Sequence, residues 1–175
     1  MNKKQDGVVL VVSLIMLLLM TLLGVAAMNT SLLEEKMAGN SRDLELAFQA
    51  AETGLRDGEL WVANQVVEPD AKSDGTSRIW TINSIDPNIA NPVNWWQERN
   101  ETWWFNNAVA YGVAIPKVKT VPHTIIEYKQ FISDDLLLGN GNSSEGVTYY
   151  RVTSRGTGGS DQARVLLQTT TARRF

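Results

Sequence analysis

The sequence has no cysteine and only one histidine, His123, which follows Pro122 and has no partner at nucleophile or metal spacing. The lack of cysteine excludes disulfide scaffolds, thiol nucleophiles and thiolate metal sites. A single histidine disfavours an all-histidine metal site. Proline is also scarce, at 5 of 175 residues, and 43% hydrophobic against 20% charged residues is typical of a folded chain. A net charge of −3 provides no overall basic field. We predict no enzyme activity, no cofactor and no nucleic-acid partner.

Charge is likewise missing from a long stretch near the N-terminus. Residues 7–33 contain no charged side chain, and the run from Val8 to Met28 is almost entirely apolar. As a helix with a rise of ~1.5 Å per residue this run spans roughly 30 Å, the thickness of bilayer hydrocarbon. Because Lys3 and Lys4 precede it, the positive-inside rule predicts a cytoplasmic N-terminus and a C-terminal domain on the other side of the membrane. We therefore predict a single-pass membrane protein.

Three interpretations of this apolar segment compete. A cleaved secretory signal has a shorter apolar region of about 7–15 residues, and Val25-Ala26-Ala27 is a weak processing site for one. A pilin-like protein is cut before the apolar run, after Gly7, and keeps the helix. A plain membrane anchor keeps the whole segment. The sequence that follows decides between them.

Apolar residues after this segment recur at spacings of three and four, which predicts an amphipathic helix. The Gly39-Asn40 pair can interrupt the helix there, with the asparagine as N-cap and Asp43 in the first turn, but we expect a helical stem that is continuous or nearly so from Val8 to about Asn64. Glu52 and Arg56 have the spacing of an i,i+4 ion pair. A sheet or a partner must cover the apolar stripe. The stripe consists of Leu44, Ala47, Phe48, Ala51, Leu55, Gly58 and Val62.

Residues 65–107 form a connector in which prolines, an Asp-Gly pair and many asparagines mark turns. We expect loops there, with one short strand around Arg78–Ile82. Tryptophan is enriched where proteins bind one another, so the connector's tryptophan pairs are a candidate partner-docking or sugar-binding surface. The alternative is that these rings fill the core, which their large area favours. The tryptophans in question are Trp95, Trp96, Trp103 and Trp104.

From residue 108 onward the pattern changes to a period of two. The β-rich runs, separated by turn residues, predict a four-stranded antiparallel meander in which residues 156–161 join the last two strands. Packing the apolar stripe on one face of this sheet buries both surfaces. The predicted fold is α+β, with a long N-terminal helix packed on an antiparallel sheet. The runs are Ala108–Pro116, Thr124–Ile132, Val147–Arg155 and Ala163–Ala172.

Four blocks of this sequence resemble one family: Gly7–Leu14, Leu22–Asn40, Ala47–Glu52 and Tyr150–Gly159. On these residues the chain resembles the PilX-type minor pilins of the type IV pilus system. The first three blocks fall within about the first 60 residues and are jointly specific, and the fourth is a shorter, supportive match. The rest of the chain matches only in the order of its elements.

The resemblance implies a processing site, partners and a location. A prepilin peptidase cleaves after Gly7 and Val8 is N-methylated. The subunit first lies in the bacterial inner membrane with its C-terminal domain in the periplasm, and then moves into a helical filament. The expected partners are other minor pilins, the major pilin and a tip adhesin, in a complex that starts the pilus. The expected segments are a leader (1–7), a transmembrane and filament-core helix (8–33), an amphipathic helix (34–64), the connector (65–107) and a sheet (108–175).

The chain departs from the family pattern at the fifth mature position. Major pilins that resemble this stem carry Glu there, which pairs with the N-terminal amine of a neighbouring subunit, whereas this chain has Val12. An unpaired carboxylate in an apolar filament core is costly, so a subunit without it loses nothing by having no neighbour above it. We hypothesise that the protein lies at or near the pilus tip and helps to start the filament. Alternatively, Val12 is an ordinary lipid-facing residue of an anchor.

Two further candidate binding sites have weaker support in the sequence. Asp134, Asp135 and Glu145 gather oxygens in one loop but lack the spacing of a recognised calcium loop, so a solvated turn is favoured and we predict no metal. The terminal hairpin concentrates arginines, for which pairing with acidic neighbours is favoured over contact with DNA. These arginines are Arg151, Arg155, Arg164, Arg173 and Arg174.

Two classes of function stay open at this point. The first is a structural subunit, a minor pilin that takes part in pilus assembly. The second is a binding module, either a pseudopilin of a type II secretion system, which shares the stem, or an anchored periplasmic receptor whose tryptophan loop recognises a ligand.

Overall fold

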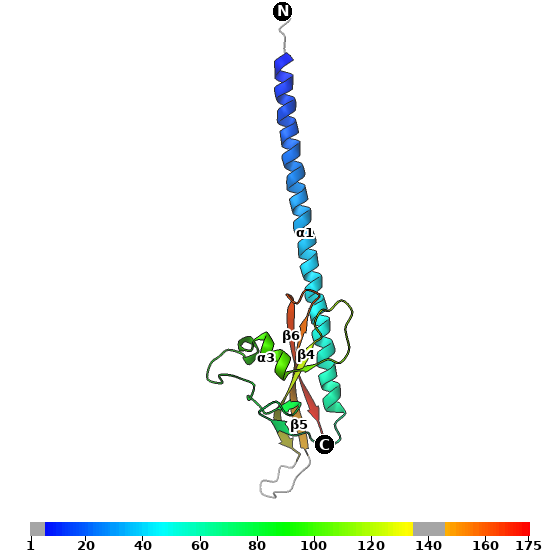
Figure 1. Ribbon diagram of the computed structural model, residues 1–175, viewed down its shortest axis with the longest axis vertical. Helices are drawn as coiled ribbons and strands as arrows, with labels where there is room; N and C mark the ends of the chain where they lie inside the picture. Colours follow the sequence, from blue (N-terminus) through cyan, green and yellow to red (C-terminus); the bar gives the residue numbers. More distant parts are fainter. Residues whose placement is uncertain (1–5, 135–145) are drawn as a thin grey trace, which may run out of the picture. The chain divides into compact units, whose positions relative to one another are not determined.

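The computed structural model describes residues 6–134 and 146–175, and the chain divides into two compact units, Met1–Arg42 and Asp43–Phe175. The longest element is helix α1, Asp6–Ala63, which contributes to both units (Figure 1). In its first part the apolar side chains are exposed all round, Val8 at 64% and Leu23 at 71%. This is the one helix among the described residues that is long and apolar enough to cross a membrane. Its apolar surface requires lipid or other helices as surroundings.

Helix α1 runs without a break through Gly39 and Asn40, which confirms the expected continuous stem, whereas the interruption and the Asn40 cap are wrong. A glycine inside a helix costs only about 1 kcal/mol relative to alanine, which is too little to end a helix between good helix formers. Asp43 therefore does not lie in a first turn, and its carboxylate is used for a tertiary contact instead.

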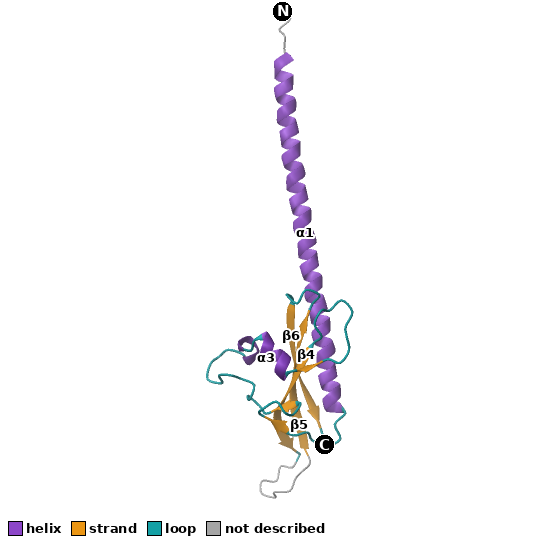
Figure 2. Cartoon of the chain, in the orientation of Figure 1, coloured by secondary structure: helices purple, strands orange, loops and turns teal. Residues whose placement is uncertain are grey.

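The Asp43–Phe175 unit is built on one mixed sheet in the order β1-β2-β4-β5-β6, with β3 pairing with β4 (Figure 2). Strands β4, β5 and β6 are antiparallel, whereas β1 and β2 join the sheet in parallel. The strands are β1 Ala71–Lys72, β2 Ile79–Trp80, β3 Val109–Ala110, β4 His123–Ser133, β5 Gly146–Thr157 and β6 Arg164–Arg173.

The predicted fold class is confirmed, but several details of the sheet are wrong. Only Val109–Ala110 of the first predicted strand pairs, because the chain turns away once the Tyr111 amide donates to the carbonyl of Pro122. The sheet is not purely antiparallel, since the connector adds β1 and β2 in parallel on the side of β4 that faces away from β5. Residues 156 and 157 belong to β5 rather than to the loop that follows.

The connector also contains two short helices where loops were expected, α2 Trp95–Glu98 and α3 Glu101–Asn107. Asn100 caps α3, since its side-chain oxygen accepts from the Trp103 amide at 2.9 Å. These helices lie on the face of the sheet opposite to α1 (Figure 1). They close the core on that side.

Alternation along β4 divides the core into two clusters. Ile126 packs on the α1 side with Val62, Tyr150 and Val152, whereas Ile125 packs on the other side with Trp104. Consecutive strand residues point to opposite faces, so each face of the sheet has its own apolar layer.

Helix α1 approaches the sheet closely because small residues line both surfaces. Ala47, Ala50 and Ala51 are fully buried on the helix, and a methyl group on Gly156 of β5 would overlap the Ala51 backbone nitrogen. A methyl group on Gly58 would lie 2.6 Å from Cγ1 of Val152. Bulky side chains do not fit such a contact, which is why the helix has alanines where it meets Gly156 and a glycine where it meets Val152.

The predicted stripe is therefore only partly right. Ala47, Ala51, Gly58 and Val62 lie in the buried face as predicted, but Leu44 and Phe48 are 52% and 47% exposed. The predicted Glu52–Arg56 ion pair is present at 2.5 Å.

Replacing Gly156 by alanine should lower the free energy of unfolding by about 1–3 kcal/mol, because the added methyl group forces the α1 backbone away from β5. Denaturant unfolding of the full chain in detergent micelles, followed by tryptophan fluorescence, measures the change. Gly112→Ala is the matched control, since an added Cβ there meets no atom within 4 Å. Equal stability of the two variants would contradict the close contact.

Candidate functional site

The connector tryptophans form one cluster on the sheet face that α1 leaves open. The rings of Trp95 and Trp104 stack with centroids 5.4 Å apart, and Trp103 lies edge-on to both. Trp95 and Trp104 are buried, whereas Trp96 and Trp103 are half-buried. Two of the four predicted surface residues therefore form the core of this side, and only Trp96 and Trp103 can meet a partner.

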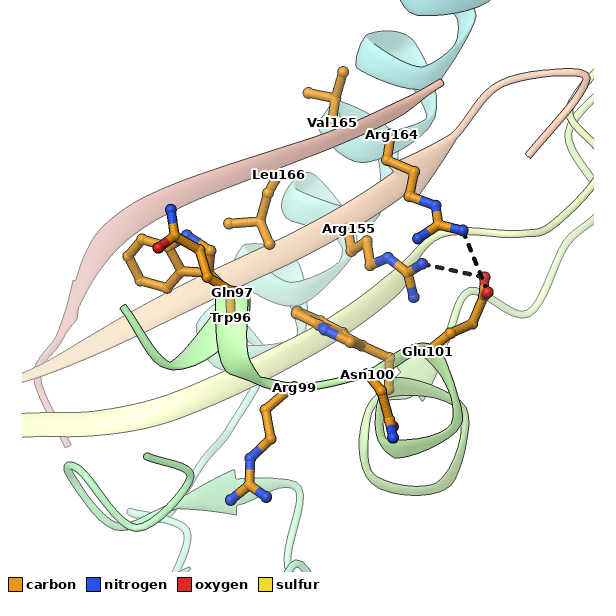
Figure 3. Close-up of a pocket in the computed structure, with 10 residues that line it drawn as sticks. Trp96, Gln97, Arg99, Asn100, Glu101, Arg155, Arg164, Val165 and Leu166 are labelled. Carbon is orange, nitrogen blue, oxygen red and sulfur yellow. Dashed lines mark hydrogen bonds and ion pairs between the residues drawn. The ribbon is translucent and has the colours of Figure 1, made fainter. Parts of the chain in front are cut away.

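A cavity of about 270 Å³ lies between this cluster and strands β5 and β6 (Figure 3). Trp96 and Trp104 provide its aromatic wall, Leu166 an aliphatic one, and Arg155 and Arg164 its charged side. The cavity is thus partly apolar and carries polar groups that can orient a bound group, the usual composition of a binding pocket.

The Glu101 carboxylate in this cavity pairs with two arginines. Arg155 and Arg164 each donate to an oxygen of Glu101, at 3.2 and 3.3 Å (Figure 3). Arg155 also lies over the Trp104 ring, 5.8 Å from its centroid, whereas Arg99 points away from these groups. The two arginines exceed the one acid, so the cavity carries net positive charge and suits an added carboxylate.

The other arginines of the terminal hairpin also have partners. Arg151 forms two hydrogen bonds with the buried Glu127, at 2.8 and 2.9 Å. Burial raises the pKa of Glu127, and the hydrogen bonds from Arg151 act in the opposite direction. Arg173 donates to the Gln65 carbonyl at 3.0 Å, and Arg174 pairs with Asp134. Pairing within the chain thus occupies these side chains.

The weak calcium candidate is only partly visible. Asp134 binds Arg174, while Asp135 and Glu145 lie outside the described residues. Within residues 6–134 and 146–175, no group of three or more His, Asp or Glu residues is placed to hold a metal ion.

His123 begins β4 and is buried, with its ring 4.7 Å from that of Phe105. Burial lowers the pKa of His123 and so favours the neutral imidazole.

Asp43 makes a tertiary contact that the sequence pattern does not predict. Its carboxylate accepts hydrogen bonds from the backbone amides of Gly159 and Ser160, at 2.6 and 3.3 Å, and from the Ser160 hydroxyl. The Ser160 hydroxyl, with the backbone donors, lowers the pKa of Asp43. This contact ties the loop after β5 to the helix. The sequence held only one hint, the pair of glycines at 158 and 159, which permits close approach.

The processing and register positions lie in the other unit. Gly7 and Val8 belong to the first turn of α1, and Val12 follows one turn later with its side chain 49% exposed.

A transmembrane-length apolar helix, continued by an amphipathic part that packs on a sheet, is the architecture of a pilin-like protein. The family model described as PilX N-terminal matches residues 6–56, and the one described as type IV pilus assembly protein PilX C-term matches residues 49–173. The chain belongs to this family of type IV pilus assembly proteins. Searches of curated proteins and of solved structures each gave no significant match.

Membership of the family assigns the chain a role in type IV pilus assembly and confirms the resemblance inferred from the four sequence blocks. The apolar helix and the family together indicate membrane anchoring and association with the pilus. Sequence reasoning missed Glu101 as the centre of the cavity. The Asn-Glu pair at the start of α3, a common helix-start signal, could have pointed to it.

Truncation of the tryptophans should separate core from surface. Trp104→Ala should lower the free energy of unfolding by about 3–5 kcal/mol, because Trp104 is almost completely buried. Trp96→Ala, which removes a half-buried ring of the same size, should cost clearly less. Unfolding of the full chain in micelles measures both. A larger loss at Trp96 than at Trp104 would contradict the placement of the cluster.

Proposed function

We propose that this protein is a minor pilin that acts in the complex that starts the type IV pilus, together with other minor pilins and a tip adhesin. The observation that carries the proposal is the apolar part of α1, which is exposed all round and continues into a domain of the pilus assembly family. Such a helix needs lipid before assembly and other helices after it. A filament built of these helices supplies the second environment.

The proposed processing follows from the same helix. A prepilin peptidase removes residues 1–7 on the cytoplasmic side, and Val8 becomes the N-methylated first residue. Everything from Val8 onward, including the whole apolar run, then stays in the mature subunit. This proposal rests on the family match and on the absence of charge in residues 7–33.

The proposed position at the tip rests on Val12. A subunit inside the shaft has a neighbour above it whose amine can pair with a carboxylate at this position. A valine needs no such neighbour, and burying it among apolar helices is favourable. The chain is thus suited to be the subunit at the tip of the filament rather than one of the repeating subunits of the shaft.

The family match favours the pilus over the pseudopilus of a secretion system, because the matched family is one of type IV pilus assembly proteins. The alternative of an anchored receptor has less support. Trp95 and Trp104, half of the predicted tryptophan surface, are used to build the core.

Val12→Glu should interfere with pilus initiation or with formation of the complex, because it gives the subunit a carboxylate that must find a partner in an apolar surrounding. Pili per cell and co-purification of the other minor pilins are the two measurements. Val12→Leu, which stays apolar, is the control and should behave as the unchanged chain does. Normal piliation together with normal co-purification in the Val12→Glu variant would count against the tip position.

A further inference from the structure

Strand β6 forms one edge of the sheet. Arg164–Arg173 is 10 residues long and, within the described part of the chain, pairs only with β5. Every residue of β6 is half-buried or exposed, whereas most residues of β5 are buried. A strand of this length in such a position presents unpaired backbone donors and acceptors along its outer side.

The edge lacks the usual protection against pairing with another chain. Residues 165–172 contain no charged residue and no proline, and they are rich in threonine and aliphatic side chains. The register with β5 is continuous from Thr148 to Thr157, with no bulge that would twist the edge away. Edge strands are normally blunted by one of these devices, so an edge without them is available to a further strand.

Charge argues against a second copy of this chain as that strand. Arg164 lies at the start of β6 and Arg173 and Arg174 at its end, with no acidic residue between them. In either orientation of a full β6–β6 pair, arginines would lie beside arginines, which is destabilising. The complementary strand is one that carries carboxylates.

The cavity described above adjoins the same edge. Arg164 and Leu166 of β6 line it together with Trp96, so one residue of an added strand could lie in the cavity opening (Figure 3). The two arginines that share Glu101 leave net positive charge there. Backbone pairing along β6 would provide affinity, and the cavity would select an acidic residue.

We propose that the outer edge of β6 and the adjoining cavity bind an extended, acidic segment of another pilus subunit, which adds a strand to the sheet. This interaction rests on the proposed function, since the partner is a component of the same complex. It places the contact between globular domains on β6.

The exposure of β6 permits a direct test in cells that assemble pili. A photoreactive amino acid at Thr170, an exposed β6 residue, should crosslink to another pilus subunit, and mass spectrometry should locate the crosslink in a segment that contains Asp or Glu. The same group at Lys129, exposed on β4, is the matched control and should give much less product. A third position, Leu17 in the apolar part of α1, reports on contacts made through the stem.

The three positions distinguish this proposal from the function on which it rests. If Leu17 crosslinks to pilus subunits but Thr170 does not, or if Thr170 crosslinks only to a second copy of the chain, the β6 proposal is overturned and the minor-pilin function stands. If neither position reaches a pilus subunit, both fail. A Thr170 product no more abundant than the Lys129 product also overturns the β6 proposal.

Substitutions of Arg164 test whether its positive charge selects the bound segment. Arg164→Glu should reduce the Thr170 crosslink several-fold, whereas Arg164→Lys should retain most of it, because only the first reverses the charge beside the cavity. Undiminished crosslinking in the Arg164→Glu variant would rule out selection of an acidic segment.

Discussion

The contact on which the rest of the C-terminal unit depends is the close approach of α1 to β5. Ala47 and Ala51 face Gly156, where backbone meets backbone, and Gly58 faces the Val152 side chain, so little side-chain volume separates the helix from the strand. Such packing tolerates almost no added atoms, because interiors are filled as densely as organic crystals. It seals one face of the sheet and leaves the other face for the tryptophan cluster.

Because α1 covers one face of the sheet and the tryptophan cluster covers the other, the edges of the sheet are its accessible parts. One edge is occupied by the short strands of the connector, and the other is β6. The charges of the terminal hairpin are largely paired within the chain, through Glu101, Glu127 and Asp134. What the unit offers to other molecules is therefore local: an open strand edge, a positively charged cavity and a half-buried Trp96. This suits a protein that works by contacts with other subunits.

The sequence allowed the main features to be predicted where a pattern had a single physical solution. An uncharged run of membrane length, a helical stripe and alternating strands led to α1, β4, β5 and β6. Prediction from the sequence failed where the position of a residue depended on tertiary contacts. Leu44 and Phe48 have the right spacing for the stripe, but the space against Gly156 admits only alanine, which a periodicity cannot reveal. The parallel strands β1 and β2 are two residues each, too short to show an alternating pattern in the sequence. Glu101 pairs with Arg155 and Arg164 only because β5 and β6 bring these two arginines beside it in the folded chain.

The central claim is that the apolar helix survives processing and that only a short leader is removed from it. The intact mass of the chain, extracted from the membranes of cells that assemble pili, tests this directly. The account predicts a mass that corresponds to a chain starting at Val8 with one added methyl group. A chain that still starts at Met1, or one cut behind Met28 so that the apolar helix is lost, would contradict it.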